Sequence, residues 1–133
     1  MTDADDQVLY LSVEDLVDIA AIVTGRAAQV RDYGLLSSSA ARPGTVAFGV
    51  VAYPDLFEKA AALLHSVCMN HALIDGNKRL AWAAAMVMLD INGHPVPDID
   101  VDAAEAFVLS VAGGTLTEVP EIAAELRRFY PPA

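Results

Sequence analysis

The sequence predicts an all-α fold, and three observations support that class. Apolar residues recur at spacings of three and four along most of the 133 residues. Residues that start or stop helices, such as Ser12, Asn92-Gly93 and Gly113-Gly114, separate these apolar runs. One short stretch, 45–51, is rich enough in β-branched residues to be extended. We therefore expect a six-helix orthogonal bundle, with residues 1–133 in a single domain.

The first third of the chain is expected to begin with a helix behind Ser12, whose hydroxyl suits an N-cap. Its apolar face continues at helical spacing until Tyr33-Gly34, where we expect the run to stop. Ser37-Ser38-Ser39 resembles a cap and Pro43-Gly44 a break, which together indicate a short helix and a loop before 45–51. The apolar face consists of Val13, Leu16, Val17, Ala20, Val23 and Ala27.

Four longer helices are expected in the rest of the chain. Pro54 suits the first turn of a third helix over about 54–70. A fourth helix, about 77–91, is apolar nearly all round, as expected of a central helix enclosed by others. Asp100 or Asp102 opens a fifth helix, and 117–130 supplies a sixth.

Composition limits the class of protein. Hydrophobic residues make up 55% of the chain, yet the richest apolar run, 80–91, is shorter than the roughly 20 residues of a membrane span. The N-terminal residues Met-Thr-Asp-Ala-Asp-Asp are acidic, unlike a signal peptide, and the single cysteine, Cys68, excludes an internal disulfide. We expect a cytoplasmic protein that does not enter a membrane. The apolar surplus indicates either an exposed groove that a partner covers or an alanine-rich core.

A nine-residue segment between the third and fourth helices, His71–Arg79, carries the main functional signal. It combines a proton acceptor, a carboxylate, a glycine turn and two cations at the start of a helix, where backbone N–H groups attract anions. The cations Lys78 and Arg79 outnumber the acid Asp75, although the whole chain has a net charge of −10. A local positive pocket in an acidic protein favours a nucleotide polyphosphate over a nucleic acid.

The pattern His71-x-x-x-Asp75-Gly76-Asn77-Lys78-Arg79, followed by an apolar helix that ends at Asn92-Gly93, resembles the Fic/Doc family. Within that family it is similar to the Doc branch, the toxins of bacterial toxin–antitoxin pairs. The likeness includes the length, the six-helix layout, the segment Tyr53–Phe57 and the closing segment Leu126–Tyr130. It implies a Fic/Doc domain whose motif loop lies between the two central helices.

Two positions divide the family by reaction. Fic proteins that transfer AMP carry glycine where this chain has Lys78, and a second arginine where it has Trp82. The resemblance therefore implies a reversed ATP, with the γ-phosphate toward His71, and a protein kinase that modifies a Ser or Thr hydroxyl. For Doc the implied target is elongation factor Tu, and an antitoxin whose disordered tail folds into an apolar groove is the implied inhibitor.

The resemblance also implies a role for the first three motif residues, beside which a simpler interpretation stays open. His71 would act as general base, or be a helix cap or surface residue. Asp75 would hold Mg²⁺, or be a carboxylate that the helix dipole stabilises. Gly76 would let phosphate approach the backbone, or be a turn glycine.

The remaining motif residues have similar alternatives. Asn77 is expected to be a capping side chain first and a ligand contact second. Lys78 and Arg79 would neutralise phosphate charge, or be surface cations. Leu73 stands where the family usually has Phe, an apolar replacement that would still anchor the loop.

Other residues and functions stay open. His65 and His94 are expected to be structural, and the sequence does not decide whether Arg26 and Arg31 approach the motif. AMP transfer is the second enzymatic hypothesis, and a silent binding module of the same fold is the third alternative.

Overall fold

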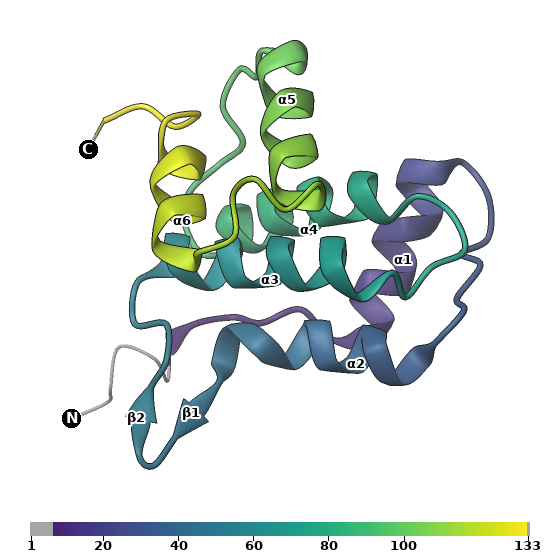
Figure 1. Ribbon diagram of the computed structural model, residues 1–133, viewed down its shortest axis with the longest axis horizontal. Helices are drawn as coiled ribbons and strands as arrows, with labels where there is room; N and C mark the ends of the chain where they lie inside the picture. Colours follow the sequence, from purple (N-terminus) through teal and green to yellow (C-terminus); the bar gives the residue numbers. More distant parts are fainter. Residues whose placement is uncertain (1–6, 133) are drawn as a thin grey trace.

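The computed structural model describes residues 7–132, and the all-α class expected from the sequence is confirmed (Figure 1). The acidic residues 1–6, which argued against a signal peptide, lie outside the described residues. The described part contains six α-helices, α1 to α6, with a short 3-10 helix, η2, and a small hairpin between α2 and α3. The helices are α1 (Val13–Thr24), α2 (Tyr33–Ala41), α3 (Leu56–Asn70), α4 (Asn77–Ile91), α5 (Val101–Ala112) and α6 (Val119–Arg127).

The start of α1 is confirmed, and its end is earlier than expected. The Ser12 hydroxyl accepts a hydrogen bond from the Asp15 amide at 3.1 Å, and the Asp15 carboxylate accepts one from the Ser12 amide at 2.8 Å. This reciprocal pair satisfies two N–H groups at the helix start. The helix stops at Thr24 because Gly25 adopts the left-handed conformation with φ 73°. The expected extension of the helix to Ala27 is therefore wrong.

The expectation that Tyr33-Gly34 stops a helix and that Ser37-Ser38-Ser39 caps one is also wrong. These residues lie inside α2, and the cap is Asp32, whose carboxylate accepts a hydrogen bond from the Leu35 amide at 3.0 Å. Ser39 is buried in the helix, and its hydroxyl donates to the Leu35 carbonyl at 3.1 Å. Serine tolerates this position because it can bond within its own helix.

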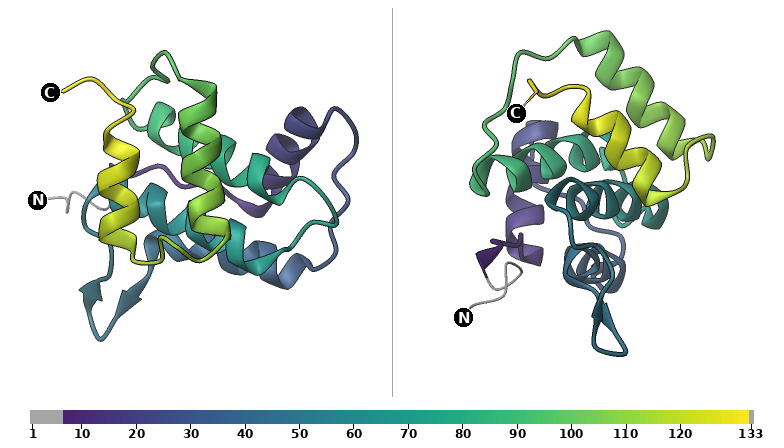
Figure 2. Two further views of the ribbon diagram at one scale, coloured as in Figure 1. Left: turned by 45° about the horizontal axis from the view of Figure 1, so that its top comes forward. Right: turned by 90° about the vertical axis from the view of Figure 1, so that its left-hand side faces the viewer.

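A hairpin follows the break at Pro43-Gly44, which forms η2 (Arg42–Gly44). Strands β1 (Val46–Ala47) and β2 (Val50–Val51) pair antiparallel, as the β-branched residues predicted. The turn places Phe48 and Gly49 at positive φ, the geometry that suits tight hairpins. The hairpin stands away from the helical body in both views of Figure 2.

The two central helices are α3 and α4, which lie side by side in the middle of the molecule (Figure 1). Helix α1 packs on α4, α2 and α6 pack on α3, and α5 packs on both central helices. Asp55 caps α3, because its carboxylate accepts hydrogen bonds from the amides of Phe57 and Glu58. Pro54 therefore precedes the helix instead of starting it. The core is rich in alanine, as one alternative predicted; its alanines include Ala60, Ala61, Ala62, Ala81, Ala84 and Ala85.

The last three helices agree closely with the sequence. Helix α4 covers the expected residues, and Asn92 follows it as the C-cap. Asp100 caps α5, which stops at Gly113, and α6 is shorter than the expected range 117–130. No helix among residues 7–132 has the length and apolar character required to cross a bilayer.

Candidate active site in the loop between α3 and α4

His71 ends α3 in a left-handed conformation, with φ 49° and ψ 45°. Few non-glycine residues adopt this conformation, so it needs support from its surroundings. Arg31 provides such support because its guanidinium donates a hydrogen bond to the His71 carbonyl. The His71 side chain is exposed, and no other group in residues 7–132 hydrogen-bonds to its ring. His71 is thus held through its backbone, while neither ring nitrogen has a hydrogen-bond partner among residues 7–132.

Asn77 fixes the shape of the motif loop. Its side-chain oxygen accepts a hydrogen bond from the Leu73 amide at 3.0 Å, and its side-chain nitrogen donates to the Leu73 carbonyl at 2.9 Å. The expected helix cap is therefore wrong: Gly76 occupies the N-cap of α4, and the Asn77 side chain closes the loop instead. Leu73 is buried with 2% of its surface exposed, so the leucine anchors the loop as the sequence predicted.

A second segment, 25–32, lies along the motif loop and closes one side of the site. The amides of Arg31 and Asp32 donate to the Ala72 carbonyl at 2.8 and 3.1 Å. The Ile74 amide donates to the Gln29 carbonyl at 2.9 Å. These backbone bonds place the segment and the loop as a short antiparallel pair.

This docking brings Arg26 to the motif. Its guanidinium forms an ion pair with the Asp75 carboxylate at 3.1 Å, and the two side chains are 54% and 70% exposed. The sequence left open whether Arg26 and Arg31 approach the site, because helical periodicity carries no information about contacts forty or more residues apart. Both arginines do approach it, one at each end of the loop 71–75.

Gly76 occupies the N-cap of α4 with φ 90°, a conformation that favours glycine. A Cβ atom at this position would lie 2.6 Å from Cγ2 of Thr24, so the end of α1 leaves no room for a side chain. A glycine cap supplies no side-chain acceptor, so the first N–H groups of α4 are available to an anion.

All the motif residues predicted from the sequence line one cavity of about 500 Å³. Buried Cys68 also lines it, and burial raises the pKa of its thiol to about 11. Cys68 therefore stays protonated at neutral pH and cannot serve as a thiolate nucleophile. The residues from the motif are His71, Asp75, Gly76, Asn77, Lys78 and Arg79, with Ile74 and Ala112 beside them.

The other two histidines lie outside this cavity. Nη1 of Arg42 donates to Nδ1 of His65 at 2.6 Å. Burial and the charge of Arg42 lower the pKa of His65, so its ring is neutral at neutral pH. His94 packs edge-on against Phe57, with ring centroids 5.1 Å apart. Both have the structural surroundings that the sequence predicted.

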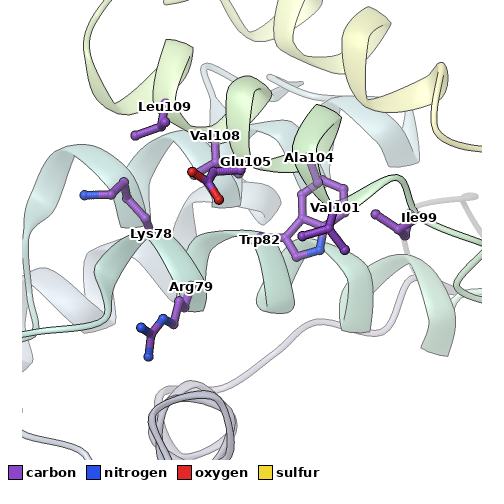
Figure 3. A pocket seen from close by; sticks show the side chains of 9 residues that line it. All are labelled: Lys78, Arg79, Trp82, Ile99, Val101, Ala104, Glu105, Val108 and Leu109. Atoms are coloured by element: carbon purple, nitrogen blue, oxygen red, sulfur yellow. The ribbon is translucent and has the colours of Figure 1, made fainter.

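An apolar groove of about 380 Å³ continues from the motif between α4 and α5 (Figure 3). Lys78 and Arg79 lie at one end and Trp82 toward the other, so the groove and the motif cavity share the two cations. Val101 and Leu109 on α5 are 71% and 48% exposed along this groove. The exposed groove and the alanine-rich core thus both contribute to the apolar surplus of the chain.

Comparison with known proteins agrees with this geometry. Residues 10–89, which include α1 to α3, the motif and nearly all of α4, match the model of the Fic/DOC family. The chain belongs to the Fic/DOC family. It is also 50% identical over 121 residues to the protein named Toxin Doc of Mycolicibacterium smegmatis, across 90% of this chain and 92% of that protein.

The donor set of this Fic/DOC site decides which metal chemistry fits. Asp75 is the one carboxylate among the described residues that line the cavity. Residues 7–132 contain no group of three or more His, Cys, Asp or Glu side chains suited to a metal ion. Mg²⁺ commonly takes one or two carboxylates and completes its shell with phosphate oxygens and water. The site therefore fits Mg²⁺ that arrives with a nucleotide, and does not fit a metal held by protein ligands alone.

Proposed function

We propose that this chain is the toxin of a toxin–antitoxin pair and acts in the cytoplasm as a protein kinase of the Doc type. It would transfer the γ-phosphate of ATP to a Ser or Thr hydroxyl of a translation factor, which by resemblance is elongation factor Tu. One observation carries the proposal: a single cavity collects an accessible imidazole, one carboxylate and two cations at the start of α4. The likeness to Toxin Doc supports the toxin assignment.

The residues of the cavity have separate tasks in this reaction. His71 accepts the proton of the substrate hydroxyl as its oxygen bonds to the γ-phosphorus, while the bond from that phosphorus to the bridging oxygen breaks and ADP leaves. Lys78 and Arg79 neutralise the charge that develops on the phosphate oxygens. Asp75 would hold Mg²⁺, which supplies charge neutralisation when bound. Gly76 and Asn77 contribute N–H groups at the helix start.

The surroundings of Lys78 and Trp82 favour phosphate transfer over AMP transfer. Lys78 lines the cavity where the AMP-transferring relatives have glycine, so its side chain takes space that an α-phosphate would need. Trp82 packs edge-on against Phe129 and Phe107, with centroid distances of 5.2 and 6.2 Å. An indole in an aromatic cluster offers no cation for the outer phosphates.

The antitoxin would bind in the groove between α4 and α5. Its walls are mostly apolar apart from Glu105 and the two cations, and Val101 and Leu109 leave exposed surface that an amphipathic helix could cover. Because the groove ends at Lys78 and Arg79, a segment bound there would also cover the two cations of the active site. This arrangement couples inhibitor binding to loss of nucleotide access.

Placement of a radiolabel separates the two enzymatic functions. The purified chain is incubated with a bacterial extract and ATP labelled at either the γ- or the α-phosphate. We expect label from γ-labelled ATP on one abundant protein and a matching gain of phosphate by mass spectrometry. Label from α-labelled ATP would establish AMP transfer and contradict the argument from Lys78.

A growth experiment tests the third alternative, a silent binding module. Induced expression should arrest growth, and His71→Ala should relieve the arrest because the general base is lost. If His71→Ala arrests growth as strongly as the unmodified chain, the module acts by binding. If the unmodified chain causes no arrest, the toxin assignment is wrong.

A further inference from the structure

The segment 25–32 carries two arginines that contact the two functional ends of the motif loop. Arg31 donates to the backbone carbonyl of His71, and Arg26 pairs with the side chain of Asp75. The backbone bonds between this segment and the loop fix the distance between the two elements. Arg31 thus contacts the backbone beneath the proposed base, whereas Arg26 contacts the carboxylate proposed for the metal.

A metal ion bound at Oδ2 of Asp75 would compete with Arg26 for that oxygen. The carboxylate oxygen Oδ2 of Asp75 lies 3.1 Å from Nη2 of Arg26, within hydrogen-bond distance. Both side chains are more than half exposed, so solvent screens the pair and little free energy is needed to separate it. The Arg26 guanidinium is therefore held next to the motif cavity by its ion pair with Asp75, which a stronger ligand of Asp75 can replace.

Released from Asp75, Arg26 would add to the positive charge of the cavity. The lining residues Lys78 and Arg79 outnumber the acid Asp75 by one charge, which is a small excess for a triphosphate. A guanidinium presents its N–H donors in a planar fork that matches phosphate oxygens. The backbone pairing at Gln29 and Arg31 keeps Arg26 near the cavity after the ion pair opens.

We propose that Arg26 is a nucleotide-binding residue that exchanges partners: it pairs with Asp75 in the ligand-free protein and with phosphate oxygens when Mg²⁺ and nucleotide bind. This inference rests on the proposed function and adds a third cation to the site. The exchange keeps Asp75 neutralised and the segment 25–32 closed against the loop while the cavity is empty. It also makes nucleotide affinity depend on Arg26 most strongly when Mg²⁺ is present, because the metal takes over Asp75 and releases the arginine.

Calorimetric titration with ATP in the presence of Mg²⁺ tests the exchange. The full-length protein carries His71→Ala, which removes turnover. Arg26→Gln should weaken ATP binding about tenfold, the effect of losing one charged hydrogen bond. Arg26→Lys should bind ATP with an affinity between those of the other two proteins, because lysine keeps the charge but lacks the planar set of donors of a guanidinium. Arg128→Gln is the matched control: Arg128 is also an exposed arginine in an ion pair, with Glu125 at 3.4 Å, and it lines a different cavity, between α5 and α6.

A double-mutant cycle with Asp75→Asn shows whether the partners are exchanged. Without divalent metal, Asp75→Asn should tighten ATP binding when Arg26 is present, because the arginine is released and a negative charge is removed. In the Arg26→Gln background the gain should be several-fold smaller, since only the charge effect remains. Equal gains in both backgrounds would show that Arg26 is not released toward phosphate.

The outcomes also separate this inference from the proposed function. If Arg26→Gln binds ATP as tightly as the Arg128→Gln control, Arg26 forms only a surface ion pair and the inference is wrong, while the kinase proposal stands. If the His71→Ala protein with Arg26 intact binds no ATP in the presence of Mg²⁺, the nucleotide site itself is wrong. Circular dichroism of each variant confirms that the fold is retained.

Discussion

Helix α3 carries one histidine within it and ends at another, six residues apart, and each lies beside an arginine. Arg42 donates to the ring of His65 and also contacts the hydroxyls of Tyr53 and Ser66, at 3.1 and 3.0 Å. At the other position the arginine bonds the backbone carbonyl of His71 and leaves the ring facing the cavity. The same two residue types thus build a structural network at one place and an accessible imidazole at the other.

The difference lies in which atom of histidine the arginine contacts. At His65, burial and then the charge of Arg42 lower the pKa, and the hydrogen bond from Arg42 also occupies a ring nitrogen. A cation at the carbonyl fixes the backbone and leaves both ring nitrogens for a substrate. A histidine beside an arginine is therefore a candidate base only when the arginine does not occupy its ring.

The largest expected effect separates the two histidines by activity. His71→Ala should lower the rate of phosphate transfer about 100- to 10,000-fold, the usual contribution of a general base. His65→Gln should leave the rate close to that of the unmodified chain, because its ring lies outside the cavity. Transfer is measured with γ-labelled ATP and a bacterial extract. A comparable loss in both variants would show that the comparison between the two sites is wrong.

The next prediction concerns the tight packing at the active-site end. Gly76→Ala should cost about 1–2 kcal/mol for the left-handed backbone and about 1–3 kcal/mol more for the contact with Thr24. Gly93→Ala is the matched control, since Gly93 has φ 97° and open space around its Cβ position. Urea unfolding gives both values. Thr24→Ala should recover part of the loss in Gly76→Ala and none in Gly93→Ala.

Removing Arg42 should lower stability and spare activity, whereas removing Arg31 should lower activity and spare stability. Arg42→Met is expected to lower the free energy of unfolding by about 1–3 kcal/mol, because partly buried partners lose their donor, while transfer activity is retained. Arg31 is exposed, so Arg31→Met should change the free energy of unfolding by about 0.5 kcal/mol or less. It should still slow phosphate transfer, because the His71 backbone loses the hydrogen bond that holds it. Urea unfolding and transfer assays on both variants decide this; equal effects on both quantities would contradict it.

The smallest expected effect is a pH dependence that comes from His65. Its pKa is lowered in the folded protein from an ordinary value of 6.5, so the unfolded chain binds the proton more readily. Its contribution to stability is therefore present above pH 6.5 and is lost as the pH falls below that value. His65→Gln should weaken the fall in stability below pH 6.5 relative to the unmodified chain. Parallel curves of unfolding free energy against pH for the two proteins would mean that the pKa of His65 does not change on unfolding.

Local signals in the sequence predicted much of the fold. The N-cap at Ser12, the range 77–91 and the cap at Asp100 depend on residues within a few positions of each other, and the structure confirms all three. The wrong expectations arose where two local signals competed. Asp32 caps α2 although three serines stand nearby, because its carboxylate reaches the Leu35 amide.

For the candidate site, the sequence by itself determined the cluster of His71, Asp75, Lys78 and Arg79, because one loop and one helix start hold them together. Only the tertiary structure decided that Arg26 and Arg31 reach the same loop. Their contacts depend on backbone pairing between 25–32 and 72–74, and such pairing between segments far apart leaves no period in the sequence. Local capping and helical spacing can be inferred from neighbouring residues, but the distance between two arginines and a remote loop is set by how the helices pack.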